Sequence, residues 1–450
     1  MTDTDTDQHT DLSNARSFAE SNQGVVLYCA ATGKWLIWNG SFWEWDEVEA
    51  VMCLAQNHVN AMLDEALAIA DGYKRRACVQ DALRSQNRAR IESMLRLARA
   101  HLPVRLEELD CNPLLLNVAN GTLDLSAMTL RRHRQADFIT RQAPVEYEPT
   151  AKCPQWTKFL REITNDSQPV IDYLQRCVGY TLTGETAEHC LFILFGTGLN
   201  GKSTFVEALR CVFGDYARTA DFSAFASGRP TSGARNDLAR LATARLVTAA
   251  ESDNGCELAE SVVKQVTGGD KIAARFLYAE SFEFTPAFKL WLCTNHRPKI
   301  RGVDDGIWRR IRLIPFTVRI PDEKIDRHLL AKLGAEASGI LTWAVEGLKQ
   351  YRVQGLNEPP AIKAATSDYR FDEDVLGRFI AACCSIGPAC KVQARKLHYA
   401  FQEWAKSFGE PLLDERKFAQ ALASHGISGA KTKTGKFWQG IELAVVTGDG

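Results

Sequence analysis

The chain has 450 residues, of which 45% are hydrophobic and 24% charged, a balance typical of folded proteins with roughly two to four domains. The formal net charge of −1 excludes attraction to nucleic acid through an overall positive field, so any such contact must come from local clusters or from several copies around a strand. The 13 cysteines lack the paired spacing of a zinc site, and no apolar stretch reaches the ~20 residues of a membrane span. We therefore expect a cytoplasmic protein with reduced thiols and no membrane partner.

The first 150 residues predict a small α+β region behind a polar tail. Residues 1–20 open with alternating Thr and Asp, and we expect a disordered tail there. Residues 21–150 form the α+β region. Its expected elements are a tryptophan-rich β-meander over 24–46, helices over about 47–71 and 86–101, and two strands joined by an Asn-Gly turn over 112–126.

Residues 151–190 predict a helical segment that follows a linker rich in proline and glutamate. Its apolar residues recur with helical spacing over 155–164 and 168–180. The second helix is followed by Gly184, shortly before a buried strand.

The strongest motif of the chain lies in residues 191–204. Leu191 to Phe195 is an apolar run that predicts a strand buried on both faces, and helical spacing resumes over 205–212. Between them stands G-x-x-x-x-G-K-[ST], a loop whose backbone N–H groups cradle phosphate, whose lysine reaches the β- and γ-phosphates and whose hydroxyl binds magnesium. The expected contacts are Gly196, Thr197, Gly198, Leu199, Asn200, Gly201, Lys202, Ser203 and Thr204. An incidental glycine turn would leave the register of glycine, lysine and serine unexplained.

Polar side chains end the next predicted strands. The apolar run 246–250 is followed by Glu251, which could polarise the attacking water or hold the metal shell. The strand over 288–294 is followed by Asn295, which could position that water. Arg309 and Arg310 precede a strand over 311–316 and could stabilise transition-state charge, in their own subunit or in the next one.

The remainder of the chain predicts a mainly helical end. An α/β core over 191–320 is followed by a helical lid and linker over 321–360. A third block covers 361–450, with helices near 372–385, 393–407 and 415–425 and then a hairpin that carries Lys431, Lys433 and Lys436 at its turn. Three helices and a basic hairpin are the outline of a winged helix, which binds duplex DNA or docks to protein.

Five segments together make a specific resemblance. Residues 196–318 resemble the helicase domain of the superfamily 3, AAA+-related replicative helicases, and in particular the phage and plasmid primase-helicase family that includes the poxvirus uncoating helicase. The segments are 196–204, 245–251, 264–275 (Lys-Gln-Val-Thr-Gly-Gly-Asp-Lys-Ile-Ala-Ala-Arg), 288–298 and 304–316 (Asp-Asp-Gly-Ile-Trp-Arg-Arg-Ile-Arg-Leu-Ile-Pro-Phe). Residues 20–46 and 112–185 are similar to parts of the family that precede the helicase domain.

The resemblance implies an α/β P-loop core and a role for each matching residue. Lys202 and Ser203 would bind phosphate and magnesium, Glu251 would be the acid of the second nucleotide motif, and Asn295 the sensor. Arg310 would be the finger that reaches the neighbouring subunit's site, with Arg309 a close competitor. A hairpin from Lys271 to Tyr278 would grip single-stranded DNA in a central pore, through the charges of Lys271 and Arg275 and the rings of Phe276 and Tyr278.

Two departures from the family pattern stand out. Ala250 occupies the place of a first acid before Glu251, so one carboxylate must serve both metal and water unless Asp253 helps. No carboxylate cluster or zinc motif of a primer-making domain precedes residue 190, so we expect any primase to be a separate partner.

The sequence therefore predicts an ATP- and Mg²⁺-dependent DNA helicase of phage, plasmid or prophage replication. The resemblance implies a homo-hexameric ring that acts on single-stranded and forked DNA. The alternatives are an ATPase that remodels proteins, whose turnover would be indifferent to DNA, and an origin-binding initiator with little turnover. A small-molecule kinase fits least, because segments 264–275 and 304–316 would have no role in it.

Overall fold

The structure is a computed structural model that describes residues 10–228, 236–250, 256–275, 281–302, 304–432 and 435–444. The chain divides into two compact units. The first comprises Met1–Pro149 with Phe213–Tyr216, and the second comprises Thr150–Val212 with Ala217–Gly450. Within the described ranges, no helix combines the length and the hydropathy needed to cross a membrane.

The first unit begins with a helix where the sequence predicted a tail. Helix α1 (Asp11–Ser21) is capped by the Thr10 side chain, and the fully buried Phe18 anchors it in a core with α2 and α4. The prediction of disorder over residues 1–20 is therefore wrong from Asp11 onward. The polar composition of the stretch hides a helix that buries only one face: Ala15, Phe18 and Ala19.

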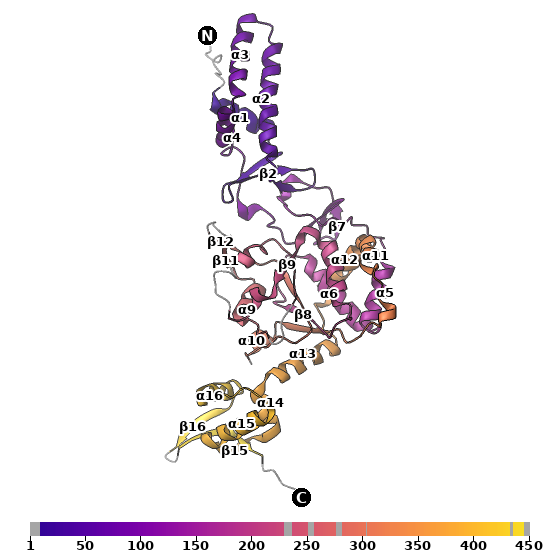
Figure 1. The fold of residues 1–450 in the computed structure, drawn as a ribbon, viewed down its shortest axis with the longest axis vertical. Helices are drawn as coiled ribbons and strands as arrows, with labels where there is room; N and C mark the ends of the chain where they lie inside the picture. The colour runs from indigo at the N-terminus through magenta and orange to yellow at the C-terminus, as the bar shows by residue number, and fades with distance from the viewer. Residues whose placement is uncertain are drawn as a thin grey trace. The chain divides into compact units, whose positions relative to one another are not determined.

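A mixed sheet and three helices complete the start of this unit (Figure 1, indigo). The predicted meander is confirmed as β1 (Val26–Cys29), β2 (Lys34–Trp38) and β3 (Trp43–Trp45), to which β4 (Pro103–Val104) adds a parallel edge. The helices are α2 (Ala50–Ala68), α3 (Gly72–Ser85) and α4 (Arg88–Ala98). The sequence did not predict α3, whose residues are mostly polar and exposed.

A second sheet follows in the same unit. Strands β5 (Leu115–Val118), β6 (Gly121–Asp124) and β7 (Thr129–Arg131) form an antiparallel meander, and β5 and β6 meet at the predicted Asn-Gly turn. The Asn117 N–H of β5 donates a hydrogen bond to the Tyr216 hydroxyl at 3.1 Å.

The second unit is built on a five-stranded parallel sheet in the order β14-β8-β13-β10-β9. Its strands are β8 (Leu191–Phe195), β9 (Ala217–Asp221), β10 (Leu246–Ala250), β13 (Lys289–Thr294) and β14 (Ile311–Pro315). The near-continuous apolar runs of β8, β10 and β13 are buried on both faces, as parallel strands covered by helices require. Four of these strands are predicted by the sequence, and β9 is not.

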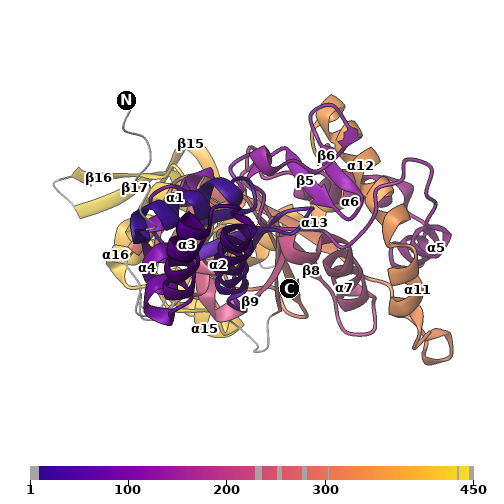
Figure 2. The ribbon, with the colours of Figure 1, turned by 90° about the horizontal axis from the view of Figure 1, so that it is seen from above.

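Helices before and after the sheet segments pack on one another. Helix α5 (Pro154–Ile163) and α6 (Gln168–Leu182) confirm the predicted pair, and α11 (Leu329–Ala335) and α12 (Ala337–Gln354) lie in the predicted helical lid. Figures 1 and 2 show α6 beside α12. Gly179 and Gly347 bring the two backbones so close that a Cβ at either position would overlap the other helix.

Two buried cations fix α6 to the sheet. The Lys289 Nζ and the Arg245 guanidinium, at the starts of β13 and β10, donate to the last carbonyls of α6 at Thr183 and Leu182. Cations favour a helix C-terminus, and burial lowers the pKa of Lys289. The sheet and the preceding helical segment are thus one packed body.

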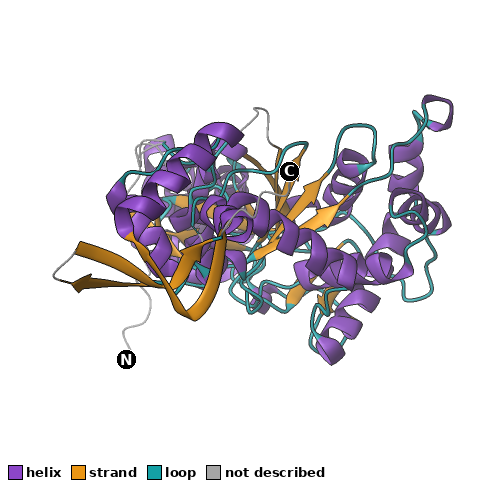
Figure 3. Cartoon of the chain, turned by 90° about the horizontal axis from the view of Figure 1, so that it is seen from below, coloured by secondary structure: helices purple, strands orange, loops and turns teal. Residues whose placement is uncertain are grey.

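The chain ends with helices and a three-stranded sheet. Helix α13 (Pro360–Glu373) packs on β14 and leads to α14 (Val375–Cys383), β15 (Cys384–Gln393), α15 (Ala394–Phe408), α16 (Glu415–Ser424), β16 (Ser428–Thr432) and β17 (Gly435–Leu443). The three helices and the hairpin are as predicted, whereas β15 is not. These strands, which are orange like all strands in Figure 3, pair antiparallel, and their order is β15-β17-β16.

Candidate active site

The site is built on the glycine loop, residues 196–201, which joins β8 to helix α7 (Lys202–Phe213). Leu199 and Gly201 adopt left-handed backbone angles, with φ of 57° and 83°. A Cβ on Gly201 would lie 2.5 Å from the Ile163 Cγ2 atom of α5, so this position demands glycine for both its conformation and its space. Thr197, Gly198 and Leu199 form the exposed crown of the loop.

Lys202, the first residue of α7, is only 5% exposed. Its Nζ donates to the Gly196 carbonyl, to the Asn200 Oδ1 at 3.1 Å and to the Asn295 Oδ1 at 3.2 Å. All three acceptors are uncharged. Burial lowers the pKa of this ammonium, because an apolar surrounding disfavours the charged form. An anion within reach would restore that pKa.

The Asn200 side chain connects the glycine loop to the end of β14. Its Nδ2 donates to the Thr197 carbonyl at 3.2 Å and to the Phe316 carbonyl at 3.1 Å, while its Oδ1 accepts from Lys202. The side chain is 3% exposed, and these hydrogen bonds join it to the loop, to the first residue of α7 and to the residue after β14. Asn200 therefore positions Lys202 rather than facing solvent.

The sheet register explains why residues 93 positions apart meet. Phe195, the last residue of β8, stands opposite Thr294 of β13 and Pro315 of β14. Because parallel strands end at the same edge, Asn295 and the glycine loop leave the sheet side by side. The chain runs from β8 to the far edge strand β9 and later returns to β14 on the other side of β8. Ligands of open α/β sheets bind at such a switch of strand order, beyond the carboxyl ends.

Two family models and several viral proteins match parts of the chain. The family described as "D5 N terminal like" matches residues 15–165, and a family of unknown function, DUF5906, matches residues 194–310. A "putative helicase" of Acanthamoeba polyphaga mimivirus is 29% identical over 332 residues, which cover 68% of this chain and 34% of the relative. A "putative primase" of African swine fever virus is 26% identical over 325 residues, covering 66% of this chain and 34% of that protein. These matches support a primase-helicase family for the chain.

The primase-helicase relatives are longer proteins. The chain spans about a third of the length of the mimivirus and African swine fever virus relatives, and 43% of a "putative helicase" of Frog virus 3 that is 23% identical over 420 residues. Among solved structures, the C-terminal region of NrS-1 resembles the fold with a TM-score of 0.52 and 9% identity, over 92% of this chain and 94% of that one.

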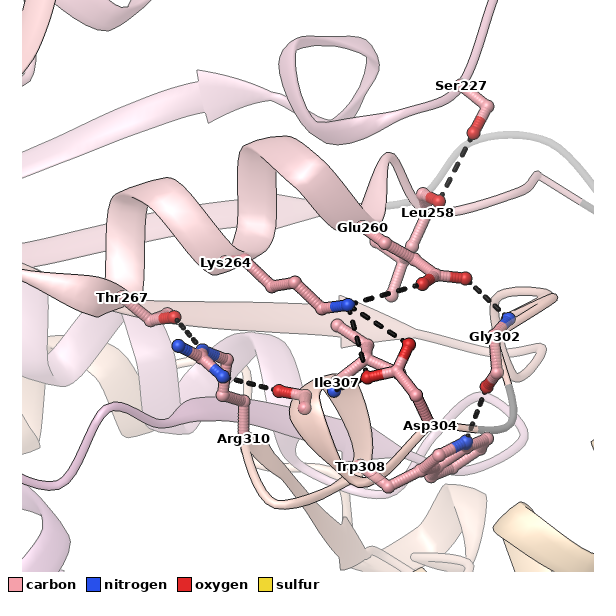
Figure 4. A network of polar contacts seen from close by, with 11 residues as sticks. Ser227, Leu258, Glu260, Lys264, Thr267, Gly302, Asp304, Ile307, Trp308 and Arg310 are labelled. Carbon is pink, nitrogen blue, oxygen red and sulfur yellow. Dashed lines mark hydrogen bonds and ion pairs between the residues drawn. The ribbon is translucent and has the colours of Figure 1, made fainter. Parts of the chain in front are cut away.

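The segment that contains Arg309 and Arg310 is held by contacts with α9 (Glu260–Gly268) and α10 (Asp305–Trp308) (Figure 4). Arg310 is 9% exposed, and its guanidinium donates to the Thr267 Oγ1 at 3.1 Å and to the Gly306 carbonyl. Arg309 is exposed. The structure thus holds Arg310 inside its own subunit and leaves Arg309 at the surface.

Sequence reasoning missed the groups that hold this arginine segment. Lys264 of α9 forms an ion pair with Asp304 at 3.1 Å, and the Glu260 carboxylate accepts from the Gly302 N–H at 2.5 Å. The Trp308 indole donates to the Gly302 carbonyl at 2.7 Å. Lys264 and Asp304 are the first residues of two of the segments that carry the family resemblance, and this position was the signal that could have pointed to them. Their ion pair across 40 positions follows only from the fold.

The structure describes only some of the remaining predicted site residues. Glu251, Asp253, Phe276 and Tyr278 lie outside the described residues. Strand β10, which precedes Glu251, runs beside β13 with Ala250 opposite Cys293. The predicted hairpin begins as β11 (Ile272–Arg275), which pairs antiparallel with β12 (Ser281–Phe284), and Lys271 before it is exposed. Ser203 is exposed and Thr204 half-buried at the start of α7.

Proposed function

We propose that this chain binds Mg²⁺-ATP at the glycine loop, hydrolyses it, and uses the energy to unwind DNA. The parallel sheet would then be the P-loop core of an AAA+-related helicase. The observation that carries the proposal is the meeting of Lys202 and Asn295 at the ends of adjacent parallel strands. A buried ammonium with three neutral acceptors beside an exposed, backbone-rich crown fits a polyphosphate.

The described residues divide the work by their chemistry. Lys202 exchanges a neutral acceptor for a phosphate oxygen, which compensates the desolvation of its charge. Asn295 accepts from Lys202 through its Oδ1, so its amide nitrogen is the group that can donate to the γ-phosphate or orient water. The Ser203 hydroxyl and the Glu251 carboxylate would hold magnesium, which would neutralise charge on the transferring phosphoryl group.

A ring of copies would bring an arginine of one subunit to the glycine loop of the next. Arg310 is engaged with Thr267 and Gly306, so we assign the role of a finger acting on the neighbouring site to the exposed Arg309. A homo-hexamer would also place six copies of the β11–β12 hairpin, with Lys271 at its base, around one DNA strand. That arrangement concentrates positive charge despite the net charge of −1.

ATP turnover with and without single-stranded DNA tests the proposal. Wild type should hydrolyse ATP faster when single-stranded DNA is added, and Lys202→Ala should lose turnover by at least about 10³-fold. Lys158→Ala, an exposed lysine of α5 whose side chain is 71% accessible, is the matched control and should behave as wild type. Turnover that DNA does not change would instead favour a remodelling ATPase, and turnover that survives Lys202→Ala would reject the site.

A further inference from the structure

The C-terminal elements carry an excess of positive charge, which the rest of the chain does not. Between Val375 and Ala444 the sequence has ten Lys and Arg residues against five Asp and Glu, in a chain whose net charge is −1. These elements have their own core, in which Phe379 of α14, Phe401 of α15, Phe418 of α16 and Trp438 of β17 are buried. Their excess positive charge is therefore displayed on a compact body and suits a polyanionic partner.

Helix α16 presents one polar face to solvent. Phe418 and Leu422, four residues apart, are buried in the core. On the opposite side of the helix, Arg416, Gln420 and Ser424 repeat with the same spacing and are all exposed. The Asp414 carboxylate is engaged as the N-cap, accepting from the Lys417 N–H at 2.8 Å. Arginine and glutamine are the side chains that read guanine and adenine with paired hydrogen bonds.

The hairpin places a lysine on the same side of the sheet as α16. Lys436 lies two residues before Trp438, so both side chains share one face, and its ammonium lies 4.8 Å from the Trp438 ring. Trp438 belongs to the core that contains Phe418 of α16. Lys391 is on the opposite face, because its neighbour Val392 is buried and its ammonium lies 4.6 Å from the Phe437 ring.

We propose that this surface, formed by Arg416, Gln420, Ser424 and Lys436, binds duplex DNA with sequence preference. The element order α14-β15-α15-α16-β16-β17 would then be a winged helix, with α16 in the major groove and the hairpin on the phosphate backbone. A helix about 10–12 Å across fits a groove about 12 Å wide. The four side chains are cationic or amide- and hydroxyl-bearing, without the aromatic rings on which single strands stack.

The test uses the full chain without nucleotide and a pool of random-sequence 30-base-pair duplexes. Repeated selection of bound duplexes should enrich one motif. Arg416→Ala and Gln420→Ala should each weaken binding to that motif by roughly 5- to 100-fold and relax the preference at one or two positions. Lys436→Ala should weaken all duplexes alike and reduce the salt dependence by about one phosphate contact. Lys391→Ala, the lysine on the other face, should bind as wild type.

Other outcomes overturn the proposal. Equal effects of Lys391→Ala and Lys436→Ala would leave only unspecific charge, and wild-type binding by Arg416→Ala would remove α16 from the interface. Tighter binding of the selected sequence as a single strand would also reject it, as would enrichment of no motif. Lys202→Ala should keep duplex binding while losing ATP turnover, so failure here and failure of the proposed ATP site are distinguishable. Circular dichroism of each variant establishes that it folds.

Discussion

At the scale of single residues, the decisive contact is the 3.2 Å hydrogen bond between the Lys202 Nζ and the Asn295 Oδ1. A neutral amide steadies the ammonium without cancelling its charge, so the charge remains available to phosphate. A carboxylate in that place would form a partly buried ion pair with the lysine and repel the nucleotide. The choice of amide over acid is therefore a requirement of the proposed chemistry.

Two substitutions of Asn295 test this reasoning. Asn295→Ala should keep nucleotide affinity within a few-fold but reduce turnover about 10²- to 10³-fold, because a positioned donor is lost. Asn295→Asp should in addition weaken nucleotide binding by at least about tenfold, since it adds a charge beside the γ-phosphate. Fluorescent-nucleotide titration and steady-state hydrolysis separate the two effects. If the Asp variant bound nucleotide more tightly than the Ala variant, this role of Asn295 would be refuted.

The glycine loop offers a matched pair of glycines. Gly201 has φ of 83° and no space for a Cβ, whereas a Cβ on Gly198 would have no neighbour within 4 Å. Gly201→Ala should lower the unfolding free energy by about 1–3 kcal/mol through backbone strain and overlap with Ile163. Gly198→Ala should change it by less than about 0.5 kcal/mol. Thermal or urea unfolding without nucleotide measures both, and equal losses would contradict the described loop geometry.

At the scale of elements, α9 and α10 distinguish the two neighbouring arginines. Arg310→Ala removes a donor to the Thr267 hydroxyl and to the Gly306 carbonyl, so it should lower the unfolding free energy by about 1–3 kcal/mol. Arg309→Ala should leave stability unchanged and abolish hydrolysis in the assembled protein. Unfolding curves and ATP turnover on both variants provide the measurement. Full turnover by Arg309→Ala would return the finger role to Arg310.

Within the parallel sheet, the strands that the sequence predicts are those with long apolar runs. Strands β8 and β10 and the centre of β13 are apolar on both faces, and β14 buries Ile311, Leu313 and Ile314, so a short apolar run identifies each of them. Edge strand β9, Ala-Arg-Thr-Ala-Asp, is half polar and has no such signature. Strand β15 contains Gly387 and Pro388, which indicate a turn, and the fold accommodates them at a register shift between Ile386 and Lys391 on an edge strand.

The candidate site, too, is only partly predictable from the sequence. The motif spacing predicted that Lys202 and the glycines form one loop, and the position of Asn295 after an apolar strand predicted that it ends near them. The direct contact between the two follows only from the neighbouring places of β8 and β13 in the sheet. Nothing in the sequence separates Arg309 from Arg310, because the difference arises from Thr267 and Gly306, which the fold brings to Arg310 alone.

At the scale of the whole molecule, the proposed ring makes each site depend on two copies. Arg309→Ala subunits lack the finger, and Glu251→Gln subunits lack the acid, so each variant alone should be inactive. A mixture forms some interfaces with Glu251 from one copy and Arg309 from the next, and should regain a measurable fraction of wild-type turnover. If both variants assemble but their mixture stays inactive, the finger does not act across an interface.

The central claim is that ATP cleavage at the glycine loop drives separation of DNA strands, and strand displacement on a forked duplex tests it most directly. Wild type with ATP and Mg²⁺ should release the labelled strand, whereas Lys202→Ala, or wild type with a non-hydrolysable ATP analogue, should release none. Lys158→Ala should match wild type. Release of the strand without hydrolysis, or vigorous hydrolysis by an assembled wild-type protein that separates no strands on forks of either polarity, would contradict the account.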